Sequence, residues 1–129
     1  MFRTDRFEIR TLNDSILRIE FFNGADIDLS DAELIHENLQ RLSDGNKYCV
    51  LLDGTGQFTT SPESRAFVAN KSSNRIAFAI VTNSIANKLV GNFFIQFNKP
   101  NTPTKLFSDE ESAIKWLIEQ KAIFDSLNK

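Results

Sequence analysis

The sequence has a single cysteine and a single histidine, and this scarcity excludes several kinds of site. With only Cys49, an internal disulfide and a zinc site built from several thiolates are both excluded. Cys49 lies in the apolar run Tyr-Cys-Val-Leu-Leu, where a free thiol is typically a buried and unreactive core residue. With only His36, no second imidazole is present for a metal site or a catalytic pair. We therefore expect neither a metal nor another cofactor.

Long apolar runs and an excess of one charge are also missing. No run approaches the roughly 18 apolar residues of a membrane span, and the N-terminal stretch MFRTDRFEIR is charged where a secretory signal would be apolar. Fifteen basic and 17 acidic residues give a net charge of −2, without the basic block that binds nucleic acid. We expect a cytoplasmic protein that neither spans a membrane nor binds nucleic acid.

The composition that is present is that of a folded globular domain. Hydrophobic residues make up 41% and charged residues 25% of the 129 residues, which suits one domain over residues 1–129 with one core. Aromatic usage is unusual, because 12 Phe accompany one Tyr and one Trp. These rings supply a large apolar area with few polar groups, and something must cover them.

Five short runs rich in apolar, β-branched and aromatic residues predict β-strands. They are residues 7–12, 16–22, 48–52, 75–82 and 105–107. The pair Asn13-Asp14 between the first two runs is typical of a tight turn, so we expect the chain to begin with a β-hairpin. The third and fourth runs are apolar on both faces, which indicates central strands covered on both sides.

Four further segments predict helices from their start signals and their periodicity. The start signals are Ser30 with Glu33, Ser61 with Pro62, Ser84, and Ser108 with Glu111. The first helix should end near Asp44-Gly45 and carry His36 on its outer, solvated face. The third should carry a broad apolar stripe along residues 85–97, and the fourth should bury Leu117 and Ile118.

The order of elements is therefore β-β-α-β-α-β-α-β-α. Strands that alternate with helices imply right-handed crossovers onto a mostly parallel sheet, whereas the hairpin makes the first strand antiparallel. The sequence predicts a single α/β domain with a five-stranded sheet.

This pattern resembles a known family. The hairpin, the alternating elements and the stretch Leu-Leu-Asp-Gly54-Thr55-Gly56 after the central strand resemble the STAS domain of anti-sigma-factor antagonists over nearly the whole chain. Residues 107–117 are similar to the tail of small bacterial STAS-like proteins of unassigned function, a relationship that also touches CRAL-TRIO lipid-binding domains. The resemblance implies a non-catalytic regulatory module that binds a protein partner.

The resemblance also implies a regulatory site. When Phe58 is aligned with the family's aromatic position, Ser61 falls at the position that antagonists phosphorylate, although Thr60 replaces the preceding Asp and Pro62 follows. Ser61, Thr60 and Thr59 are thus candidate phosphorylation sites. A phosphate would gain from the amides and the dipole at a helix N-terminus, and the alternative is that Ser61 only caps the helix.

Two further candidate sites follow from the residues themselves. Asp53, Thr55 and Gly56 lie where the central strand ends, at the edge where open α/β sheets bind ligands, but they match no nucleotide-binding motif. The residues Phe93, Phe94 and Phe97 point around more than half of a helix, so they can form core, a homodimer face or an apolar ligand cleft.

No catalytic residues are assigned, because no nucleophile and base can be paired from the sequence. The leading hypothesis is a regulatory module that binds an unidentified protein. The alternative is a carrier or sensor of a small apolar ligand held between the third helix and the sheet.

Overall fold

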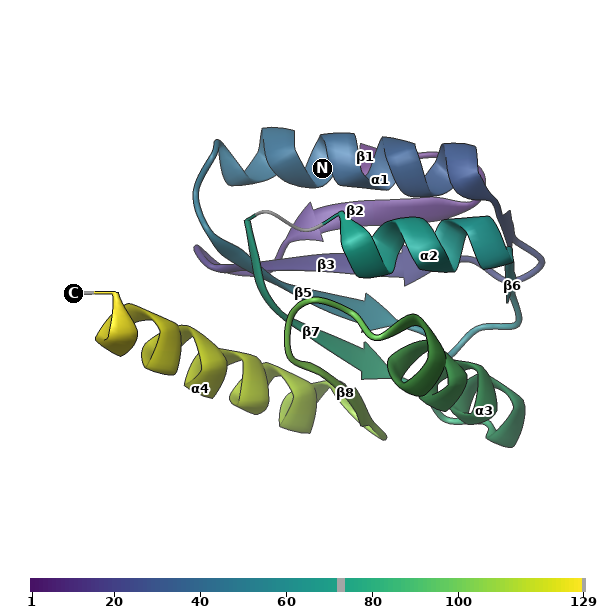
Figure 1. Cartoon of the computed structure of the whole chain (residues 1–129). Coiled ribbons are helices and arrows are strands. Elements are labelled where there is room, and N and C mark those ends of the chain that lie inside the picture. Colours follow the sequence, from purple (N-terminus) through teal and green to yellow (C-terminus); the bar gives the residue numbers. More distant parts are fainter. Residues whose placement is uncertain (72–73, 129) are drawn as a thin grey trace.

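A six-stranded sheet runs through the molecule in the order β1-β2-β3-β5-β7-β8 (Figure 1). The computed structural model describes residues 1–71 and 74–128. The strands are β1 (Phe2–Arg3), β2 (Phe7–Thr11), β3 (Ile16–Phe21), β5 (Tyr48–Asp53), β7 (Arg75–Val81) and β8 (Thr104–Phe107). The pairs β1–β2 and β2–β3 are antiparallel and the other three pairs are parallel. The predicted mostly parallel α/β sheet is confirmed, with β1 as one strand more than the five expected.

A second sheet of two short strands joins the loops at the carboxyl edge of the large one. In it β4 (Asp26–Ile27) runs parallel to β6 (Thr59–Thr60). The backbone N–H of Ser61 donates to the carbonyl of Ile27, which holds the starts of the first two helices together. Neither strand is predicted by the sequence, because two residues are too few to show a periodicity.

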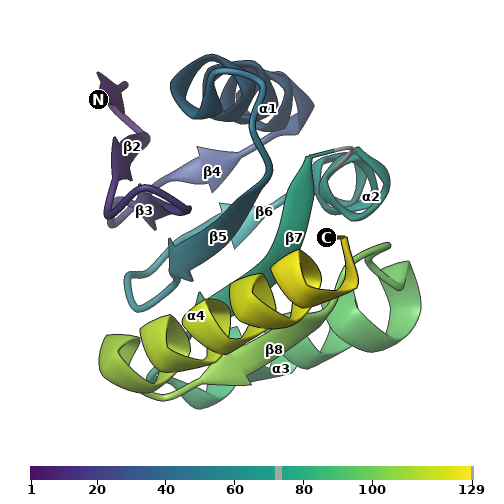
Figure 2. The same ribbon diagram turned by 90° about the vertical axis from the view of Figure 1, so that its left-hand side faces the viewer.

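Helices cover both faces of the large sheet. They are α1 (Leu29–Ser43), α2 (Pro62–Asn70), α3 (Ile85–Phe93), the π-helical turn η1 (Phe94–Asn98) and α4 (Glu110–Leu127). The first core lies between the sheet and α1, α2 and η1, and the second lies between the sheet and α4. Figure 2 shows α4 on the opposite side of β5 and β7 from α1 and α2.

Two of the predicted helix starts are shifted. α1 is capped by Asp28, whose carboxylate accepts from the N–H of Asp31 at 2.9 Å, and not by Ser30. The pairing of β4 with β6 fixes the chain up to Ile27, so the helix begins directly afterwards and Ser30 lies inside it. α4 is likewise capped by Asp109 and not by Ser108. Aspartate caps helices as well as serine does, and the sequence could not decide between neighbours.

The second core shows why α4 packs closely on the sheet. β7 presents the small residues Ala77 and Ala79 to α4, and both are fully buried. Ala113 and Leu117 of α4, four residues apart, pack against them. Ile118 lies about 100° further round the helix and is 54% exposed, so the prediction that it is buried was wrong.

Candidate functional site

The carboxyl edge of the sheet contains the predicted loop, and Asp53 organises it. Its Oδ2 accepts from Arg18 Nη2 at 2.7 Å, while its Oδ1 accepts from the backbone N–H and the hydroxyl of Thr55 at 3.1 and 2.6 Å. Gly56 follows at a point where an added Cβ would come within 2.9 Å of Asn23 Oδ1. The structure thus brings Asp53, Thr55 and Gly56 together, and Asp53 is occupied in holding the loop.

The three candidate phosphorylation sites follow the same loop, and each hydroxyl has a local partner. The hydroxyl of Thr59 donates to the carboxylate of Asp26. Thr60 Oγ1 accepts from Arg65 Nη1 at 2.8 Å. Ser61 caps α2, because its hydroxyl accepts from the N–H of Ser64 at 3.1 Å.

The three candidate phenylalanines of α3 and η1 separate into two groups. Phe93 and Phe97 are 48% and 70% exposed, and their rings stack at 4.8 Å. Phe94 is buried in the first core, 6.1 Å from the ring of Phe78. The side of α3 opposite this pair carries Gly91, where an added Cβ would come within 2.8 Å of Leu106. The close approach of β8 at this glycine therefore sets the orientation of the helix. The apolar stripe predicted along residues 85–97 therefore faces outward.

A cavity of about 330 Å³ lies between the sheet and the helices α1, α2 and α3. The sequence analysis did not find it. Its floor and walls are mainly apolar. They include Ile19, Val50, Leu52, Phe78 and Ile80 from the sheet, Ile35 and Leu39 from α1, Phe67 and Val68 from α2, and Phe94 from η1. The volume is at the low end for ligand pockets, enough for a small molecule.

The cavity exists because α2 packs loosely on the sheet. Only Ser64 and Ala69 of α2 are buried, and both are small. By contrast, α1 buries Ile35 and Leu39 against the same face. A helix of this length, about 14 Å, covers the parallel strands but leaves the space beneath it unfilled. The scarcity of large apolar residues in residues 62–70 was the available sequence signal.

Two polar atoms at the carboxyl end of the cavity lack partners. Thr82 is 3% exposed and Arg65 is half-buried, and both line the cavity. Within the part of the chain that the structure describes, Thr82 Oγ1 and Arg65 Nε are buried without a hydrogen bond. Buried polar groups of this kind need an explanation, and a bound molecule is one.

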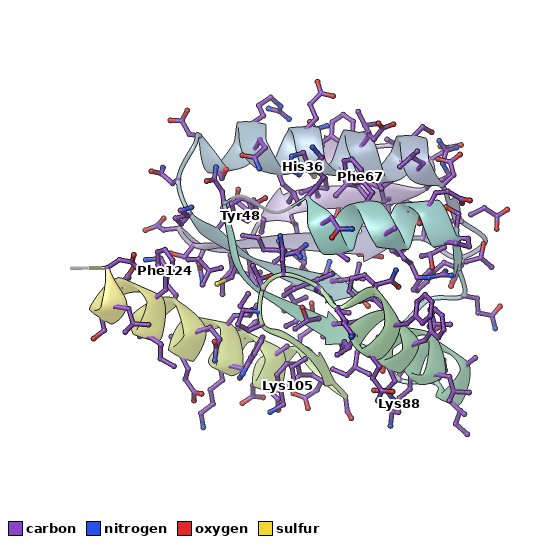
Figure 3. All side chains as sticks on the ribbon, viewed as in Figure 1. His36, Tyr48, Phe67, Lys88, Lys105 and Phe124 are labelled. Atoms are coloured by element: carbon purple, nitrogen blue, oxygen red, sulfur yellow. The ribbon has the colours of Figure 1, made fainter. Side chains whose placement is uncertain are left out.

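The other end of the cavity is formed by His36, Tyr48, Lys71 and Arg75. The prediction that His36 is solvated holds only in part, because the residue is half-buried and its ring lies 5.8 Å from that of Phe67, between α1 and α2 (Figure 3). α2 packs against the side of α1 that the sequence assigned to solvent. Burial, together with the charges of Lys71 and Arg75, lowers the pKa of His36.

Comparison with known proteins identifies the family. A family model described as a domain of unknown function, DUF7793, matches residues 10–121. The chain belongs to the DUF7793 family. A solved structure of an uncharacterised DUF3478 protein from Shewanella loihica PV-4, described as having a SpoIIAA-like fold, is 17% identical. The match covers 91% of this chain and 98% of that one, with a TM-score of 0.64. No curated protein matches the chain.

The likeness to the DUF3478 structure shows the fold. This DUF7793 chain has the SpoIIAA-like, STAS-like fold that the sequence resemblance predicted. Cys49 is fully buried, and burial raises the pKa of its thiol to about 11. Within residues 1–71 and 74–128, no helix is long and apolar enough to cross a membrane.

Proposed function

We propose that this protein binds a small apolar ligand in the cavity beneath α2, as a non-catalytic carrier or sensor. The observation that supports the proposal is the cavity of about 330 Å³, whose lining is contributed mostly by apolar side chains of the sheet and of three helices. Pockets for small molecules are typically concave and apolar, with a few polar groups that orient the ligand. The polar residues at the two ends of this cavity fit that description.

The chemistry of the lining favours a chain-like apolar ligand. Each methylene group removed from water contributes about 0.8 kcal/mol, which corresponds to about fourfold in affinity. Affinity should therefore rise by about this factor for each added methylene until the cavity is full, and then stop rising. A flat dependence on chain length would indicate binding at an exposed surface.

The experiment measures how well straight-chain alcohols displace a neutral naphthylamine dye from the protein. The alcohols have roughly six to 14 carbons, so that the series includes chains shorter and longer than a small pocket can hold. The blocking variant Val68→Phe places a ring on the roof of the cavity, and Ala66→Phe places the same ring on the exposed side of α2. We expect Val68→Phe to weaken binding at least about tenfold and Ala66→Phe to leave it unchanged. No binding to the wild type, or equal loss in both variants, would overturn the proposal.

A protein partner at the loop of residues 55–61 is the second candidate. Thr55 and Gln57 are exposed at the carboxyl edge, beside a shallower hollow. Pull-downs with the wild type and with Ser61→Asp would test this role, with Ser30→Asp as a control for added charge at a helix start. A stoichiometric partner lost only with Ser61→Asp supports the role, and no partner with any bait contradicts it.

A further inference from the structure

Arg75 is a buried cation with no anionic partner among residues 1–71 and 74–128. It begins β7, is 7% exposed and lines the cavity. Its Nε donates to Thr102 Oγ1 at 3.1 Å, and its Nη2 donates to the carbonyl of Val68 at 3.2 Å. Among the described residues, no carboxylate lies within 4.0 Å of the guanidinium, and Nη1 has no hydrogen-bond partner.

Another buried arginine of the same chain, Arg18, has the carboxylate partners that Arg75 lacks among the described residues. Arg18 has the same exposure, 7%, but its guanidinium contacts three carboxylates. They are those of Glu110 at 2.6 Å, Asp53 at 2.7 Å and Glu20 at 3.2 Å. A buried charge is costly unless it is paired, and the chain meets this requirement at Arg18. At Arg75 both hydrogen-bond acceptors are neutral, so the positive charge is left uncompensated.

Burial also makes the guanidinium of Arg75 easier to deprotonate. It lowers the pKa of Arg75 to about 10, so the side chain is still charged at neutral pH. The ring of Phe78 lies 4.9 Å from the guanidinium carbon, a contact that favours a cation but does not neutralise it.

The charge around the cavity is of one sign. The basic side chains of Arg65, Lys71 and Arg75 line the cavity, together with His36, and no Asp or Glu does so among the described residues. The sequence shows the same separation on a larger scale. Residues 64–108 contain Arg65, Lys71, Arg75, Lys88, Lys99 and Lys105 but no acidic residue. A ligand that enters this cavity meets an apolar interior and only positive charge.

We propose that the ligand is an acidic amphiphile, an alkyl carboxylic acid with a single chain, whose carboxylate binds Arg75 beside Lys71 and the Tyr48 hydroxyl. This inference rests on the proposed function and names the ligand class. The chain extends beneath α2 toward Phe94 at the far end of the cavity. A volume of about 330 Å³ suits one alkyl chain better than a two-chain lipid.

Two features place the head group at Arg75 and not at Arg65. Arg65 is only half-buried, and its Nη1 already donates to the carbonyl and the hydroxyl of Thr60, so that Nε is its one buried nitrogen without a partner among the described residues. Arg75 is more deeply buried, and its Nη1 has no acceptor in the described part of the chain, so a charge-assisted hydrogen bond to a ligand would be strongest there. Tyr48 is 3% exposed, and its hydroxyl accepts a long contact of 3.5 Å from Gln40, which leaves its proton available.

The test compares decanoate with decanol, which have the same chain but differ in charge. We expect decanoate to bind the wild type about tenfold more tightly than decanol, because a charge-assisted hydrogen bond is roughly twice as strong as a neutral one. Arg75→Gln should remove this preference, and Arg65→Gln at the other end of the cavity should retain it. Lys88→Gln, at an exposed lysine that does not line the cavity, is the control that leaves the binding of both compounds unchanged. Dilauroyl phosphatidate vesicles, as a two-chain anionic probe, should not displace decanoate.

His36 provides a second measurement that needs no variant. It is the only histidine, so its ring signals in an NMR titration are unambiguous. Lys71 and Arg75 both act on its pKa, and a carboxylate bound between them should raise that pKa, whereas decanol should not.

The outcomes separate the two proposals. If neither compound binds, the proposed function fails. If both bind the wild type equally and neither raises the pKa of His36, the apolar site stands and the acidic ligand is wrong. If Arg65→Gln removes the preference and Arg75→Gln does not, the head group lies at the other end and the assignment to Arg75 is overturned. If phosphatidate vesicles displace decanoate, the ligand class is a membrane lipid and not a free acid.

Discussion

Replacing Thr82 by valine should stabilise the protein. Thr82 directly follows β7, and its backbone N–H donates to the carbonyl of Phe107 at 2.9 Å, so its main chain is satisfied. Its hydroxyl is buried without a partner among the described residues. Burying an unpaired hydroxyl costs about 1–3 kcal/mol, and valine keeps the branched shape while removing that cost. We expect the free energy of unfolding to rise by about 1–2 kcal/mol.

The assay is urea denaturation at neutral pH in protein from which ligand has been extracted. A rise of this size should move the urea midpoint upward at constant m-value and raise the melting temperature by about 3–8 °C. Thr82→Ser is the matched control, because it keeps the hydroxyl and loses the methyl group. It should lower the free energy of unfolding by about 1 kcal/mol.

A lower stability of Thr82→Val would contradict an unpaired Thr82 hydroxyl. If Thr82→Val lowers the free energy of unfolding by about 1 kcal/mol or more at unchanged m-value, the hydroxyl is hydrogen-bonded in solution. A water molecule within the cavity would then be its partner, and Thr82 Oγ1 would no longer count as an atom that awaits a ligand.

Two further predictions concern pH and self-association. Because the pKa of His36 is lowered in the folded protein, the unfolded state binds its proton first, and the free energy of unfolding should fall as pH drops below about 6.5. Urea midpoints measured between about pH 7.5 and 5.5, on either side of the ordinary histidine pKa, should fall with pH in the wild type and fall less steeply in His36→Asn. An equal dependence of the midpoint on pH in both proteins contradicts this role of His36. The exposed, stacked pair Phe93–Phe97 predicts a homodimer, so sedimentation equilibrium should show a mass that rises with concentration and is lost in Phe97→Asn. A wild-type mass that stays monomeric at all concentrations contradicts the dimer.

The sequence predicted the elements that have a clear apolar pattern or a clear helix-start signal. β5 and β7 are continuous apolar runs of the kind that both faces of a parallel sheet require, and both are central. Ser61 with Pro62 located the start of α2 because few residues combine a cap with a fixed backbone angle. The start of α1 was missed by two residues, because Asp28 and Ser30 are both good caps and only β4 decides between them.

The cavity and the orientation of α3 could not be predicted, because both depend on packing between distant segments. An apolar stripe on a helix normally indicates the buried face. On α3 this rule fails because Leu106 of β8 fits only against Gly91, on the opposite side of the helix. Likewise, the cavity beneath α2 is lined by Ser64 of α2 together with Phe78 and Ile80 of β7, which are distant from it in the sequence.

The charge pattern could be predicted from the sequence only in part. An overall net charge of −2 hides a stretch of 45 residues, 64–108, that carries six basic and no acidic side chains. The sequence shows this stretch but does not show which of its basic residues are buried. Lys88, Lys99 and Lys105 are exposed, and water is sufficient to solvate them. Arg75 is in the same stretch, but it is 7% exposed and lines the apolar cavity. The sequence therefore limits the candidate anion-binding residues to a few cations, and burial distinguishes Arg75 as the one for which we propose an anionic ligand.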